Sequence, residues 1–82
     1  GTNTVIGSPI SIAGSATGVA VNPGGYVYVT DSFNGAVVVI DPGTNTVIGS
    51  PIAVGLGPFG LAVSTGGNLY VANESDNSVS VI

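Results

Sequence analysis

The feature that most constrains this chain is a ten-residue segment that occurs twice without change. GTNTVIGSPI fills residues 1–10 and recurs at residues 43–52, a shift of 42 positions. The shift extends beyond the segment, because 20 of the 40 residue pairs that can be compared at this spacing are identical. A fixed period of about 20 to 50 residues is typical of propellers, solenoids and other repeat arrays. We therefore expect two copies of one structural unit.

The composition favours strands over helices. Val and Ile supply 21 of the 26 residues that are Leu, Ile, Val or Phe, and only three residues are Leu. β-branched side chains pack well on a pleated sheet and lose rotamer freedom in a helix. Because 26 of 82 residues exceeds the roughly one-fifth that marks disordered chains, we expect an all-β fold with a core.

Turn signals divide each period into four short segments with the pattern of strands. In the first period they are residues 3–12, 18–22, 26–31 and 35–41. Gly, Pro, Asn and Asp occupy the short links between them, and such short links join antiparallel neighbours. Four antiparallel strands in about 40 residues is the pattern of one β-propeller blade. The fold class we predict is all-β, built from β-propeller blades of four antiparallel strands, with two repeats per chain.

Two tetrapeptides and their surroundings resemble a known family. Tyr28-Val29-Thr30-Asp31 and Tyr70-Val71-Ala72-Asn73 resemble the YVTN motif, with Asp31 and Ala72 as departures; GVAVNPGG and GLAVSTGG precede them. The chain is similar to two repeats of the YVTN family of β-propellers, which occurs in surface-layer proteins. The resemblance implies that GVAV and GLAV form the innermost strands and NTVIGSPI the outermost. It also implies an extracellular or cell-surface location.

Two blades are too few to close a propeller, which needs about four to eight. We predict that residues 1–82 form a single two-blade unit. Within it, residues 1–14 are an outermost strand donated to a neighbouring unit, residues 15–56 a complete blade, and residues 57–82 three inner strands of an incomplete blade. The orphan strand at the front matches the strand that the last blade lacks. Oligomerisation or further repeats would complete the propeller.

This arrangement predicts strand addition between copies, with main-chain hydrogen bonds holding neighbours together. The assembly residues are Asn3, Val5, Ile10 and Ile12 on the donated strand, and Val79, Val81 and Ile82 on the accepting edge. The expected partner is the chain itself, in a head-to-tail ring of three or four copies or a filament. The alternative is a piece of a longer tandem array, natural or engineered. Since the chain begins at Gly1 without Met, we expect a processed product or such a piece.

The residue types that the chain lacks exclude several function classes. The chain has no Lys, Arg, His, Cys, Met or Trp and a net charge of -4. Without cations, nucleic-acid binding loses its main driving term, and without Cys or His there is no thiolate nucleophile or usual zinc ligand. The longest apolar run, residues 36–40, is far shorter than the roughly 20 residues of a membrane span. We expect no enzyme activity, no cofactor and no membrane insertion.

The four carboxylates give no catalytic or metal site. Asp31, Asp41, Glu74 and Asp76 fall at strand ends or in turns, where solvated Asx-type turn residues are common. Glu74 and Asp76 share one hairpin, so they do not face each other across a cleft as glycosidase carboxylates do. Oxygen ligands near Asp31 or Asp76 allow calcium in principle, but no calcium-loop spacing supports it.

Three residues are candidates for binding or modification. Phe33 in a hairpin and Phe59 ahead of an inner strand are possible ligand contacts, and Asn73-Glu74-Ser75 is a possible N-glycosylation site on a surface turn. Tyr28 and Tyr70 share one repeat position beside apolar residues, which favours packing between blades. The function we expect is a non-catalytic, self-assembling scaffold. The alternative is a propeller module that binds a glycan or peptide.

Overall fold

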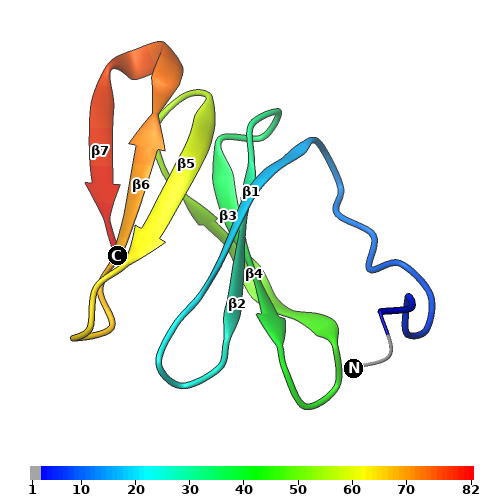
Figure 1. Ribbon diagram of the computed structural model, residues 1–82. Coiled ribbons are helices and arrows are strands. Elements are labelled where there is room, and N and C mark those ends of the chain that lie inside the picture. The colour runs from blue at the N-terminus through cyan, green and yellow to red at the C-terminus, as the bar shows by residue number, and fades with distance from the viewer. Residues whose placement is uncertain (1–2) are drawn as a thin grey trace.

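A computed structural model describes residues 3–82 of the chain, in which seven strands form two antiparallel sheets (Figure 1). The first sheet has the order β1 (Ala16–Val21), β2 (Val27–Asp31), β3 (Ala36–Asp41) and β4 (Thr46–Ala53). The second sheet has the order β5 (Pro58–Val63), β6 (Leu69–Asn73) and β7 (Ser78–Val81), with a 3-10 turn η1 (Glu74–Asp76) before β7. The predicted all-β, antiparallel fold is confirmed at this level. The two sheets do not form a closed propeller.

The hairpins turn at the residues whose chemistry predicted them. Between β1 and β2, the Asn22 side chain accepts the Tyr26 N–H at 2.9 Å, and Gly25 takes a left-handed φ of 90°. Between β3 and β4, Asp41 Oδ1 accepts the Gly43 N–H at 2.7 Å, and Asn45 has a φ of 55°. Glycine and asparagine adopt such left-handed angles most readily. Short-range side-chain bonds and left-handed residues therefore reverse the chain within a few positions.

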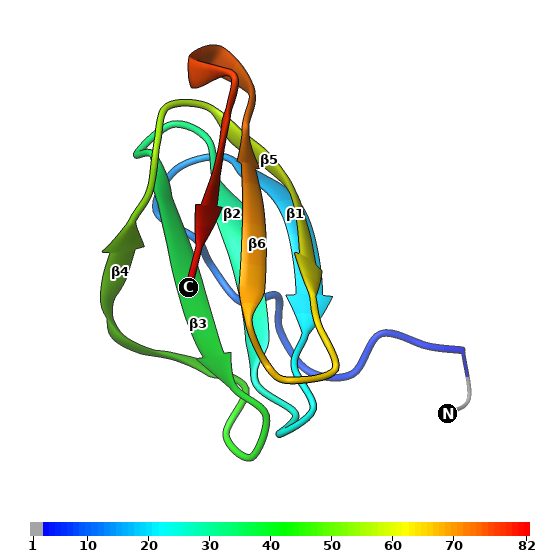
Figure 2. The same cartoon turned by 90° about the vertical axis from the view of Figure 1, so that its left-hand side faces the viewer.

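The core lies between the two sheets, which pack face to face (Figure 2). Its centre is Val37 from β3 with Leu69 and Val71 from β6, all at most 1% exposed. Tyr28 packs against this centre, as expected from its repeat position. Further half-buried side chains around it are Ile52, Val54, Leu61 and Val63. Each sheet therefore uses one face for the joint between the sheets.

A pair of threonine hydroxyls ties the two sheets together at the edge of this core. Thr17 Oγ1 donates to the Pro58 carbonyl oxygen and Thr30 Oγ1 to the Phe59 carbonyl oxygen, each at 2.9 Å. We call Thr17 and Thr30 the threonine pair. Beside them, a Cβ on Gly18 would collide with the Phe59 carbonyl oxygen. The backbones of β1 and β5 therefore approach too closely for any side chain at position 18.

The strand predicted over residues 3–12 is absent. These residues follow an irregular path along the side of the first sheet that faces away from the second sheet (Figure 1). A strand forms only against a partner strand, so the predicted donation of these residues to a neighbouring unit stays a prediction. The second sheet correspondingly stops at three strands.

Candidate functional site

The outer edge of β7 is the first half of the candidate site. Within residues 3–82, β7 pairs with β6 alone, and Ile82 beyond it exchanges two 2.8 Å backbone hydrogen bonds with Leu69. The equivalent strand of the first repeat, 42 positions earlier, is β3, and we call such equivalent elements and residues repeat-mates. Strand β3 pairs with β2 on one side and with β4 on the other. Val79 and Val81 are 61% and 59% exposed. This edge can accept a further strand through its backbone.

Residues 3–12 are the second half, and they share their sequence with β4. Residues 4–10 repeat residues 46–52 of β4 letter for letter, yet Val5 and Ile6 are each 88% exposed. Their backbone nevertheless matches the paired copy at two unusual positions. Asn3 has a φ of 59° where Asn45 has 55°, and Gly7 has 68° where Gly49 has 67°. The copy at residues 3–10 therefore already contains the two left-handed residues found at Asn45 and Gly49.

The repeat spacing specifies how the two halves would pair. In the first sheet Val37 lies opposite Ile52, Val39 opposite Ile48, and Ile40 opposite Val47. Moving these pairs by 42 positions gives three pairs between copies: Val79 with Ile10, Val81 with Ile6, and Ile82 with Val5. Of the other predicted assembly residues, Asn3 is exposed and Ile12 is half-buried. Each predicted assembly residue thus lies on an open edge or on the segment that matches it.

Asp31 differs from the solvated turn residue that we expected, because it is only 2% exposed. Burial by itself would raise the pKa of Asp31. Hydrogen bonds from the Ser15 N–H, the Asn34 side chain and the N–H groups of Asn34 and Phe33 outweigh that effect and hold the pKa below its ordinary value. The carboxylate therefore fastens the hairpin to the chain that enters β1. Glu74 and Asp76 are exposed, as expected.

Asn73 also differs from the expectation, since it ends β6 in the interior and not on a surface turn. It is 2% exposed, and its Nδ2 donates to Ser78 Oγ at 3.2 Å and Ser80 Oγ at 2.9 Å. The folded chain therefore does not present this amide nitrogen for glycosylation. Its Oδ1 is buried without a hydrogen-bond partner.

The aromatic candidates lie on different elements. Phe33 is 81% exposed in the hairpin between β2 and β3, whereas Phe59 on β5 is 45% exposed and its carbonyl accepts the Thr30 hydroxyl. Neither ring lines the apolar hollow on the second sheet or the hollow beside Asp31. Binding of a glycan or peptide at Phe33 or Phe59 stays a prediction.

Residues 3–82 contain no group of three His, Cys, Asp or Glu side chains that could hold a metal ion. In the same range, no helix has the length and hydropathy needed to cross a membrane.

Sequence reasoning missed the threonine pair and the close approach at Gly18. Their repeat-mates are Phe59, Ala72 and Gly60, so two of these three positions change between the repeats. That departure from an otherwise regular pattern was the available signal.

No family model and no curated protein matches the chain.

Proposed function

We propose that this chain is a non-catalytic scaffold that assembles with copies of itself, each copy donating residues 3–12 to the edge of β7 on the next. The observation that carries the proposal is the pair of identical segments in two environments. One segment forms strand β4 of the first sheet, and the other forms no strand, in a chain whose second sheet has three strands.

The free energy of such an addition has two sources. Backbone hydrogen bonds would form along β7, as they do along β3. Apolar side chains that are now exposed, Val5, Ile6, Val79 and Val81, would lose contact with water, and fully burying one valine side chain contributes about 1.5 kcal/mol or more. Because Asn3 and Gly7 already have left-handed backbones, less conformational entropy is lost on pairing.

The assembled form that we propose is a β-propeller built from YVTN-like blades, at the cell surface or outside the cell. Each chain contributes one complete blade and three strands of a second. Three copies would give six blades and four copies eight, and a head-to-tail contact that does not close gives a filament. The resemblance of the repeats to that family and the four-stranded first sheet support this form.

The decisive experiment joins the two halves by a disulfide. The chain has no cysteine, so the double variant Ile10→Cys with Val79→Cys carries only the two introduced thiols. We expect covalent multimers on a non-reducing gel and a native mass of three or more chains. The variant Val37→Cys with Ile52→Cys is the matched control, since it joins the equivalent pair within one chain and should stay monomeric on a denaturing gel.

A register control makes the test specific. Ile6→Cys with Val79→Cys places the second thiol two positions along β7 from Val81, the expected partner of Ile6, and should give little multimer. Deleting residues 1–12 should dissolve the assembly. A folded monomer in light scattering, with no disulfide between copies in the Ile10 and Val79 variant, would refute the proposal.

A further inference from the structure

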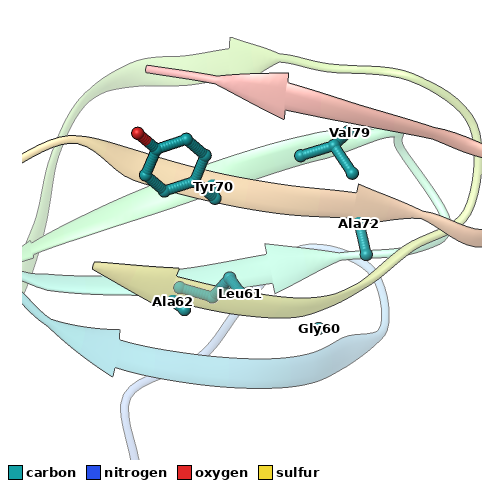
Figure 3. Close-up of a pocket in the computed structure, with 6 residues that line it drawn as sticks. All are labelled: Gly60, Leu61, Ala62, Tyr70, Ala72 and Val79. Atoms are coloured by element: carbon teal, nitrogen blue, oxygen red, sulfur yellow. The ribbon is translucent and has the colours of Figure 1, made fainter. Parts of the chain in front are cut away.

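The second sheet carries an open copy of the face that the first sheet buries. On the first sheet this face holds Tyr28 and Val37, which meet Leu69 and Val71 across the joint between the sheets. Val37 is fully buried, whereas its repeat-mate Val79 is 61% exposed. Figure 3 shows the open face, an apolar groove lined by Gly60, Leu61, Ala62, Tyr70, Ala72 and Val79.

The first sheet carries the matching face on its other side, where Val29 and Val38 are buried and other apolar side chains are exposed. In the joint within the chain, Leu61 and Val63 pack against the core from the second sheet. Their repeat-mates Val19 and Val21 are 66% and 58% exposed. One molecule therefore presents both halves of a second joint, with the groove on its second sheet and these valines on its first.

We infer that the first sheet of a second copy packs against this groove, and that this is the same copy that donates residues 3–12. The inference deepens the proposed function and rests on it. Residues 12–15 lead from the donated strand into β1, just as residues 54–57 lead from β4 into β5. Both links are fastened alike, since Ser15 accepts the Ser32 N–H and Gly57 accepts the Glu74 N–H, each at 3.0 Å.

The joint between copies differs chemically from the joint within the chain. Phe59 and Ala72 stand where the threonine pair stands in the first repeat, so the two hydroxyl groups that bind Pro58 and Phe59 have no counterpart there. The joint between copies is therefore the more apolar of the two.

Gly60 is the residue that decides whether this joint can form. Its repeat-mate Gly18 has no room for a Cβ, because the Phe59 carbonyl oxygen of β5 occupies that space. Around Gly60 nothing lies within 4 Å of the position of a Cβ. A methyl group at position 60 therefore fits the single chain but would strike the Thr17 carbonyl oxygen of the second copy.

The test places Gly60→Ala in the Ile10→Cys, Val79→Cys background and compares the yield of disulfide-linked multimers. Gly66→Ala is the matched control, since its Cβ would meet only Ser64 Oγ, at 3.8 Å, in a turn away from the groove. We expect Gly60→Ala to lower the yield of multimers at least about tenfold while the circular dichroism spectrum keeps its strand signal. We expect Gly66→Ala to change neither.

A second variant approaches the joint from the opposite face. Val19→Asp puts a charge on an exposed position of β1 and should cause the same loss. If both Gly60→Ala and Val19→Asp crosslink like their parent, the second copy does not pack against the groove, while strand donation stands. If the parent itself does not crosslink, the proposed function fails.

Discussion

Asp31 and Asn34 lie at the two ends of the hairpin between β2 and β3. At the equivalent positions of the second repeat the two residue types are reversed, as Asn73 and Asp76. Asp31 receives three backbone N–H groups and the Asn34 side chain. Asn73, in the equivalent buried position, keeps an oxygen without a partner. The exchange can be read from the sequence, but the burial cannot, since an aspartate at a strand end has the same local pattern whether water or protein surrounds it.

Asp31→Asn should lower the stability of the chain at neutral pH and make it less sensitive to acid. A carboxylate with a lowered folded pKa stabilises the fold above its unfolded pKa of about 3.9, and this contribution is lost as the pH falls through the folded pKa. We expect a loss of roughly 1–3 kcal/mol at pH 7, shrinking towards pH 3, in denaturant titrations.

The control for this prediction is Glu74→Gln, which removes one negative charge at an exposed position. It should change the free energy of unfolding little at either pH. Equal effects of Asp31→Asn at pH 7 and pH 3 would show that the carboxylate bonds do not carry the difference.

At the scale of elements, β4 and residues 3–12 have the same sequence over most of their length. Comparing them shows which features of a strand follow from the sequence and which need a partner strand. The sequence predicts a strand in both places, and among the described residues only the second copy forms one, as β4. The turns are local properties, and turn residues predicted them; the left-handed angles at Asn3 and Gly7, which were not predicted, recur at Asn45 and Gly49. Pairing depends on a partner strand that the sequence pattern alone does not supply.

The same substitution in the two copies should therefore act on different properties. Alanine in a left-handed conformation is unfavourable by about 1 kcal/mol relative to glycine. Gly49→Ala should lower the free energy of unfolding by about that amount. Gly7→Ala should leave the unfolding of the first sheet unchanged and weaken assembly roughly fivefold, as measured by sedimentation equilibrium. Equal effects of both variants on unfolding would contradict the separate roles of the two copies.

On the scale of the whole molecule, the charges all have one sign. The chain carries four acidic residues and no Lys or Arg, so copies cannot be joined by side-chain ion pairs. The repeat predicted two units, and the short links predicted that successive strands of the first sheet are antiparallel neighbours. It did not predict the threonine pair, because a hydroxyl that bridges two sheets has no signature in strand periodicity.

Assembly should accordingly strengthen with salt. Raising the ionic strength from about 10 mM to about 150 mM shortens the screening length from about 30 Å to about 8 Å and reduces the repulsion between acidic copies. We expect a larger assembled fraction in light scattering at the higher salt concentration, and a smaller salt effect in Glu74→Gln. Dissociation by salt would point to attractive charges that this account lacks.

The two identical segments also bear on how such an assembly responds to damage. If β4 of one chain is peeled away or cut, residues 4–10 of a free copy offer the same side chains and the same left-handed glycine to the exposed edge of β3. The replacement restores that part of the strand with its register unchanged. In the proposed assembly, a chain that loses β4 would therefore find the same strand sequence on a neighbouring copy.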